Sequence, residues 1–187
     1  VSEAVKRGLP LTNDTQIFME VAPCRTLGIT GSAGKTTTTT LVGLMAEAAL
    51  GEKAHVGGNI GDPLLNYVDE MGPEDLAVLE ISSFQLEQMT ISPQIAAVLN
   101  ITPNHLDRHG TMEAYTAAKR RILEFQSPAD TAVLGREDPG CWKLRQDVHG
   151  RLVSFGAGPL QGREDGTCLQ EGILHLRERG VDIPLLD

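Results

Sequence analysis

A glycine-rich loop between a strand-like run and a helix-like run is the feature that most constrains how this chain can fold. The loop reads Thr30-Gly31-Ser32-Ala33-Gly34-Lys35-Thr36. Residues 26–30 before it have the apolar pattern of a buried strand, and residues 37–49 after it carry apolar side chains at helical spacing. This order predicts a strand, a tight turn that can hold a phosphate, and a helix.

Each polar group of the loop has a use in binding a nucleotide, and ATP is the expected ligand. Gly31 and Gly34 let the backbone turn so that several N–H groups point at one anion. Lys35 can reach a terminal phosphate, and the hydroxyl of Thr36 can bind Mg²⁺. The residues expected to bind the nucleotide are Gly31, Ser32, Ala33, Gly34, Lys35, Thr36 and Thr37.

The loop is a variant of the general phosphate-binding pattern. Ile29 stands where that pattern has its first glycine, and Gly28 lies one residue too far back. A plainer interpretation is a glycine-rich turn that only caps a helix. The Gly-Lys-Thr core between a strand and a helix favours the phosphate-binding interpretation.

The composition argues against several kinds of partner. The net charge is −9, whereas a protein that binds nucleic acid is expected to present a basic face. The three cysteines are scattered and form no Cys-x-x-Cys pair, which fits a reducing cytoplasm. No apolar run approaches the roughly 20 residues of a membrane span. The prediction is therefore a cytoplasmic protein that binds neither nucleic acid nor a membrane.

Strand-like and helix-like runs alternate through the first 135 residues. The strand-like runs are 26–30, 54–56, 76–81, 95–100 and 131–134. The helix-like runs are 35–49, 63–71, 83–88 and 112–126. This alternation predicts an α/β fold in which a mainly parallel, P-loop NTPase-like sheet is flanked by helices. Further along, the short runs 151–155, 167–169 and 173–176 predict a small antiparallel β region near the C-terminus, at the edge of the sheet.

Two segments place polar side chains near the ends of predicted strands. Glu80 follows an apolar run, and an acidic residue at such a strand end helps to hold Mg²⁺ in P-loop proteins. Ser82 has capping-box spacing to Gln85, so we expect Ser82 and Ser83 to begin a helix and also to line the site. Asn59 lies in a glycine-rich segment that could be a plain turn but, near the loop, becomes a polar contact.

His105 and Lys119 are weaker candidates when each is taken alone. His105 follows a predicted strand, and loops at that end of an α/β sheet bind ligands. A zinc protease is the competing interpretation, but Leu106 stands where His-Glu-x-x-His requires glutamate. A contact of His105 with Mg²⁺ or substrate is therefore the preferred interpretation. Lys119 lies in an amphipathic run, where a single lysine is ordinarily a solvated charge.

Taken together, these segments resemble the Mur ligases, the ATP-dependent amide-forming enzymes of peptidoglycan synthesis. The matching segments are 28–37, 57–61, 80–87 and 100–121. The run Ser-Ser-Phe-Gln-Leu-Glu is similar to that of the member that adds D-glutamate to UDP-N-acetylmuramoyl-L-alanine. The resemblance implies that residues 1–23 are the tail of an N-terminal domain with its linker, and that residues 24–187 are a central ATP-binding domain. The N-terminal UDP-substrate domain and the C-terminal domain would then lie outside this chain.

The resemblance also implies a mechanism, in which ATP phosphorylates the substrate carboxylate and the amine of D-glutamate attacks the resulting acyl phosphate. Lys35 would hold the phosphates, and Thr36 with Glu80 would hold a first Mg²⁺. His105 and Lys119 would help to bind a second Mg²⁺. In members of the family, the lysine at the position of Lys119 is carbamylated. Contacts with phosphate or the muramoyl substrate would come from Asn59, Ser82 and Ser83.

Three features depart from the family pattern. Ala33 stands where the family usually has asparagine, and Asn104 replaces the usual acidic residue before the histidine. The later His-Asn motif of the family is absent, so we expect this chain alone to be inactive. The alternatives are another ligase of the superfamily, such as a folylpolyglutamate synthase, a P-loop kinase or nucleotide-driven switch, and a module that only binds a nucleotide.

Overall fold

A computed structural model describes residues 3, 6–9 and 11–186 of the chain. Within these residues, one sheet contains nine strands in the order β2-β3-β1-β4-β5-β6-β7-β8-β9. The strands are β1 (Arg25–Thr30), β2 (Ala54–Gly58), β3 (Leu76–Glu80), β4 (Ile95–Val98), β5 (Thr131–Gly135), β6 (Arg151–Phe155), β7 (Asp165–Gln170), β8 (Ile173–Glu178) and β9 (Val181–Leu186). The helix remnant expected near the N-terminus falls partly on residues outside those described.

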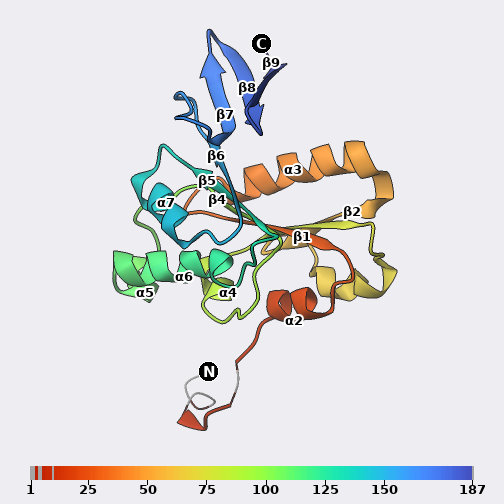
Figure 1. Ribbon diagram of the computed structural model, residues 1–187. Helices are drawn as coiled ribbons and strands as arrows, with labels where there is room; N and C mark the ends of the chain where they lie inside the picture. Colours follow the sequence, from red (N-terminus) through yellow and green to blue (C-terminus); the bar gives the residue numbers. More distant parts are fainter. Residues whose placement is uncertain (1–2, 4–5, 10, 187) are drawn as a thin grey trace.

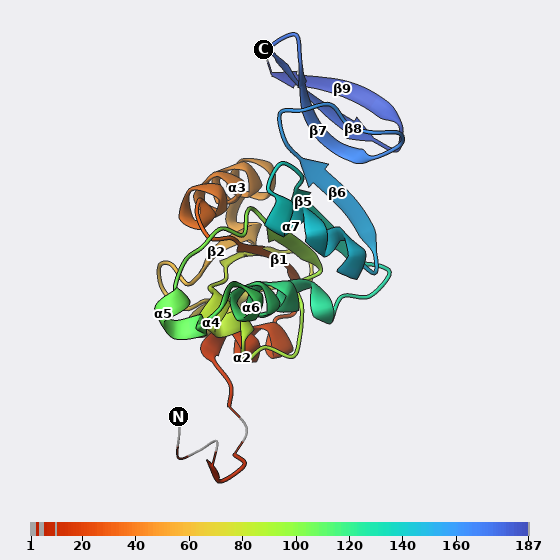
Figure 2. The same cartoon turned by 90° about the vertical axis from the view of Figure 1, so that its left-hand side faces the viewer.

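Helices cover both faces of the sheet, as a parallel sheet requires. The α-helices are α2 (Asp14–Val21), α3 (Lys35–Leu50), α4 (Ser83–Leu86), α5 (Leu106–His109), α6 (Met112–Glu124) and α7 (Pro139–Lys143). The 3₁₀ helices are η1 (Gly51–Lys53), η2 (Leu64–Glu70) and η3 (Leu144–Asp147). Figures 1 and 2 show α3 on one face and α2, α4 and α6 on the other. No described helix is both long and apolar enough to cross a membrane.

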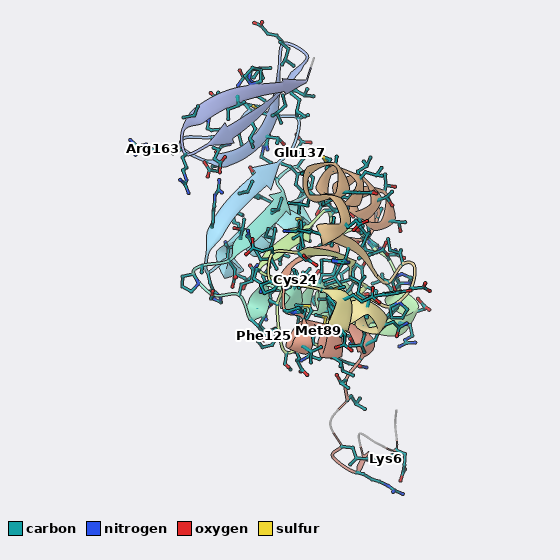
Figure 3. The ribbon with its side chains drawn as sticks, turned by 90° about the vertical axis from the view of Figure 1, so that its right-hand side faces the viewer. Lys6, Cys24, Met89, Phe125, Glu137 and Arg163 are labelled. Carbon is teal, nitrogen blue, oxygen red and sulfur yellow. The ribbon has the colours of Figure 1, made fainter. Side chains whose placement is uncertain are left out.

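The pairing confirms the predicted α/β fold. Strands β1 to β6 pair only in parallel, and β6 also pairs in parallel with β7. The antiparallel region consists of β7, β8 and β9. In Figure 3 this region projects away from the layered body, with Glu137 near its base and Arg163 at its side. The guanidinium of Arg136 ties the two parts together by donating to the carbonyls of Gly156, Gly158 and Thr167.

The assignment of residues 151–155 to the antiparallel region was wrong. They form β6, which pairs in parallel with β5 in the register Thr131↔Arg151 to Gly135↔Phe155. The short helices α7 and η3 lie between these two strands and supply the crossover that a parallel connection needs. The expected helix over residues 63–71 is instead the 3₁₀ helix η2, and strand β9 was not predicted.

The larger apolar core lies on the face of the sheet that carries α2 and α6. Phe18 from α2 and Ile122 from α6 are almost completely buried there, together with Val98 and Leu134 of the sheet. The core under α3 is smaller and contains Ile29. Because α6 is anchored by this core, the polar side chains that it also carries are held at fixed positions.

The register of the central strands brings the predicted site residues to one edge of the sheet. Glu80 at the end of β3 lies beside Ile29 of β1 and beside Gly58 of β2. The glycine-rich loop leaves β1 at this edge, and Asn59 follows β2 there. The site therefore lies at the carboxyl ends of parallel strands, where α/β proteins bind ligands.

Replacing Gly58 by alanine should destabilise the protein by about 2 kcal/mol or more. Gly58 has φ +96°, and a Cβ atom there would lie 2.4 Å from the carbonyl oxygen of Glu80. Gly180 is a matched control, because its φ is +80° but no atom lies within 4 Å of the added Cβ. Gly180→Ala should cost only about 1 kcal/mol. Urea unfolding of both variants measures the difference, and equal losses would contradict the close approach at Gly58.

Candidate active site

The glycine-rich loop is held in shape from the end of the neighbouring strand β4. The side-chain oxygen of Asn100 accepts from the backbone N–H groups of Ser32 and Ala33, at 3.0 and 2.9 Å. Its amide nitrogen donates to the carbonyl oxygen of Ala33 at 3.1 Å. Gly34, just before α3, has the left-handed φ of 81° that favours glycine. The turn predicted from the sequence is therefore present, and Asn100 is the support that sequence reasoning missed.

Glu80 is the most buried acidic side chain at this edge, with 2% of its surface exposed. The hydroxyl of Thr36 donates to its Oε2 at 2.7 Å, and the amide of Asn59 donates to its Oε1 at 2.9 Å. The residue that follows β2 and a residue of the first turn of α3 thus both bond to the carboxylate that ends β3. A carboxylate and a hydroxyl are the kinds of oxygen ligand that Mg²⁺ takes from a protein.

Lys119 reaches the glycine-rich loop from the buried face of α6. Its Nζ donates to the carbonyl oxygen of Gly31 at 2.9 Å and to the hydroxyl of Thr30 at 3.3 Å. The side chain is 1% exposed, so the prior expectation of a solvated lysine does not apply. Burial, with the nearby charge of Lys35, lowers the pKa of Lys119 to about 7. Lys35 itself folds back over the loop and donates to Gly31 O at 3.1 Å.

His105 lies just before α5 and also lines the cavity at this site. Its backbone has a left-handed φ of 52°, and its ring meets the Phe84 ring edge-on at 5.2 Å between centroids. Asn104 accepts from the His105 backbone N–H through Oδ1 and donates to Ser32 O through its amide nitrogen, at 3.3 Å. A carboxylate could not donate this second hydrogen bond. Asn104, which stands where the family usually has an acidic residue, therefore replaces a negative charge with a hydrogen bond to the loop.

The side chains of seven predicted site residues line one cavity of about 250 Å³. They are Lys35, Asn59, Glu80, Ser82, Ser83, His105 and Lys119. Phe84 and Tyr115 also line it, although neither was predicted as a site residue. Gly31, Ser32, Ala33 and Gly34 form the adjoining loop, and Thr37 lies in the first turn of α3. The structure thus brings these predicted residues together around one cavity.

The metal sites expected from the sequence would depend on ligands from outside the protein. Among the described residues, no group of three or more His, Cys, Asp or Glu side chains is placed to hold an ion. Mg²⁺ is commonly bound by one or two carboxylates together with water and substrate phosphates. Thr36 and Glu80 fit such a site. His105 and Lys119 face the same cavity, but Lys119 is a cation or a neutral amine as it stands.

Comparison with known proteins identifies the family. The sequence matches the Mur ligase middle domain over residues 29–181. The chain belongs to the Mur ligase family. A protein named UDP-N-acetylmuramoylalanine--D-glutamate ligase from Symbiobacterium thermophilum is 41% identical over 186 residues, covering 100% of this chain and 41% of that protein. One of the same name from Pelotomaculum thermopropionicum is 46% identical over 156 residues, covering 83% of this chain and 34% of that protein.

Two solved structures share the fold of this chain. MurF from Thermotoga maritima, in complex with ADP, has a TM-score of 0.60 at 23% identity, over 91% of this chain and 42% of that one. FolC from E. coli, in complex with DHPP and ADP, has a TM-score of 0.62 at 15% identity, over 94% and 53% of the two chains. This Mur ligase domain spans well under two thirds of the length of the relatives that it matches.

The depressed pKa of Lys119 makes stability depend on pH above neutrality. Below pH 7 the amine is charged in both states, so the cost of burying the charge is fully present. From pH 7 to about 10.4 the unfolded chain holds a proton that the folded chain has lost, so the free energy of unfolding rises by about 1.4 kcal/mol per pH unit. Lys119→Met should remove this rise.

The measurement is urea unfolding of the wild type and Lys119→Met between pH 7 and 9, without nucleotide or metal. The two curves should diverge by about 2 kcal/mol over this interval. Lys143→Met, at an exposed position on α7, is the matched control and should run parallel to the wild type. Parallel curves for all three proteins would show that Lys119 does not lose its proton in this range.

Proposed function

We propose that this chain is the ATP-binding part of a ligase that joins D-glutamate to UDP-N-acetylmuramoyl-L-alanine. The observation that carries the proposal is the convergence of the glycine-rich loop, the Thr36–Glu80 pair and Lys119 on one cavity. Such a site suits transfer of a phosphoryl group, which depends on positioning and charge neutralisation. The substrate pair is supported by the names of the relatives at 41% and 46% identity.

The phosphate side of the cavity would be formed by the loop and the start of α3. The free N–H groups of the first turn of α3 and the ammonium of Lys35 would bind the β- and γ-phosphates of ATP. Thr36 and Glu80 would hold a first Mg²⁺, which when bound supplies positive charge against the phosphate oxygens. Lys35 would then exchange its bond to Gly31 for a phosphate oxygen.

The carboxylate side would be formed by His105, Lys119 and the polar residues after β2 and β3. Asn59, Ser82 and Ser83 would orient the muramoyl substrate so that its carboxylate attacks the γ-phosphate in line. The products of this step are an acyl phosphate and ADP. The amine of D-glutamate would then attack the carbonyl carbon, and the amide would form with loss of phosphate and of one amine proton to solvent. A pKa near 7 supports carbamylation of Lys119, because only a neutral amine adds to CO₂. A carbamate there would be an oxygen ligand for a second Mg²⁺ beside His105.

The domain boundaries follow from the same proposal. Residues 24–187 would form the central domain, and residues 1–23 would be the tail and linker of a preceding UDP-substrate domain. A C-terminal domain would close over the nucleotide. The protein would act in the cytoplasm, without a nucleic-acid or membrane partner. Catalysis would require the flanking domains.

The decisive experiment measures phosphate release by the intact protein with ATP, Mg²⁺ and UDP-N-acetylmuramoyl-L-alanine. Release should require D-glutamate and should not be supported by L-glutamate, L-lysine or the absence of an amino acid. Release that depends on L-glutamate and a folate instead would identify a folylpolyglutamate synthase. Release that is indifferent to the amino acid would leave only an ATPase or a kinase.

Lys35→Ala should weaken ATP binding by this chain at least about tenfold, because a charge-assisted hydrogen bond to phosphate is lost. The unfolding midpoint should change little, since Lys35 is only half-buried and bonds to a single carbonyl group. Lys53→Ala, at an exposed position on η1, is the control for loss of a positive charge. Titration calorimetry with Mg²⁺ and ATP measures both variants. Unchanged affinity in Lys35→Ala would refute the phosphate assignment.

A further inference from the structure

Ser83, His109 and Glu87 form a hydrogen-bonded chain that leads from the cavity to the protein surface. The hydroxyl of Ser83, which lines the cavity, lies 3.0 Å from Nε2 of His109. The other ring nitrogen of His109, Nδ1, lies 2.9 Å from a carboxylate oxygen of Glu87. Ser83 has a role in the proposed mechanism, whereas His109 and Glu87 have none.

The His109 ring is buried beside two aromatic rings and has a polar partner at each of its nitrogens. Its side chain is 1% exposed, whereas the carboxylate of Glu87 is 45% exposed and remains hydrated. The ring of Phe84 stacks on it at 5.3 Å with an interplanar angle of 4°, and the ring of Tyr115 lies against it at 5.0 Å. Both aromatic rings also line the cavity. The position of the imidazole is therefore coupled to the wall of the site.

When His109 is neutral, the chemistry of its two partners sets the direction of each hydrogen bond. A carboxylate can only accept, so Nδ1 of His109 carries the proton that is shared with Glu87. In the neutral imidazole Nε2 is then an acceptor, and the hydroxyl of Ser83 must donate to it. This uses the only proton of the Ser83 hydroxyl. Its oxygen keeps lone pairs and can act toward the cavity only as an acceptor.

We propose that Glu87 and His109 are positioning residues that make the Ser83 hydroxyl a hydrogen-bond acceptor for an amide N–H of the substrate. This inference rests on the proposed function, in which the carboxylate of an N-acylated amino acid is activated in this cavity. The amide N–H of such a substrate is one carbon atom away from that carboxylate. An acceptor at Ser83 would therefore fix the substrate next to the group that reacts, and would disfavour an analogue without this N–H.

The direction of the hydrogen bonds can be tested on this chain alone, independently of any activity. ¹⁵N NMR of the histidine side chains at pH 8, with His109→Phe to assign the signals, should show His109 with its proton on Nδ1. Glu87→Ala should shift the population toward the other tautomer, whereas Glu87→Gln should preserve it because the amide oxygen still accepts. A wild-type His109 with its proton on Nε2 would overturn the proposal.

The effect on the substrate is tested by steady-state kinetics of the intact enzyme. His109→Phe keeps a ring between Phe84 and Tyr115 but removes both hydrogen bonds. It should raise the KM for UDP-N-acetylmuramoyl-L-alanine about three- to tenfold, with the KM values for ATP and D-glutamate changed less than about twofold. Glu87→Ala should act in the same direction, and Glu87→Gln should restore the wild-type value.

Two further comparisons separate positioning from a merely structural role. The effects of Ser83→Ala and His109→Phe should not be additive, because the first removes the acceptor and the second removes the bond that orients it. His149→Phe, which removes a hydrogen bond to Gln126 O away from the cavity, should leave all three KM values unchanged. Additive effects, or an equal rise of every KM, would overturn the proposal. If the wild type releases no phosphate in response to D-glutamate, the proposed function fails, and the tautomer of His109 alone supports or overturns the hydrogen-bonded chain.

Discussion

The site depends on one buried carboxylate. Glu80 ends a central strand, and its two oxygens receive hydrogen bonds from the segments that follow β1 and β2. Burying a carboxylate costs free energy unless its oxygens accept hydrogen bonds. The positions of Thr36 and Asn59 are therefore both constrained by the position of Glu80. The register of three parallel strands and the position of α3 are therefore linked through this side chain.

The positive groups of the site are arranged against this negative charge. Lys35 and Lys119 face the same cavity as Glu80, and burial, together with the repulsion from Lys35, lowers the pKa of Lys119. An anionic ligand between them would relieve that repulsion. Carbamylation of Lys119 would remove the same repulsion by replacing its positive charge with a negative one. In the proposed function, the positive charge that faces the phosphates would then come from Lys35 and from bound Mg²⁺.

The sequence predicted the central fold well, because local signals and long-range pairing agree there. The glycine-rich loop, the apolar runs before it and after it, and Glu80 each carry their own pattern. Strand β6 was misplaced because its crossover, α7 and η3, consists of short helices without a periodic signal. Asn100 and His109 were missed as supporting residues for another reason. Their side chains contact residues that are distant in the sequence, and local sequence patterns do not predict such contacts.

The bonds that Asn100 makes to the loop have a consequence for how a nucleotide would bind. One side chain accepts from two N–H groups and donates to a carbonyl, so the turn is shaped without any ligand. Binding then needs little ordering of the backbone, and less of the interaction free energy is lost as conformational entropy. The loop is preorganised, and the rate of nucleotide capture would be set by diffusion into the cavity rather than by a rearrangement of the loop.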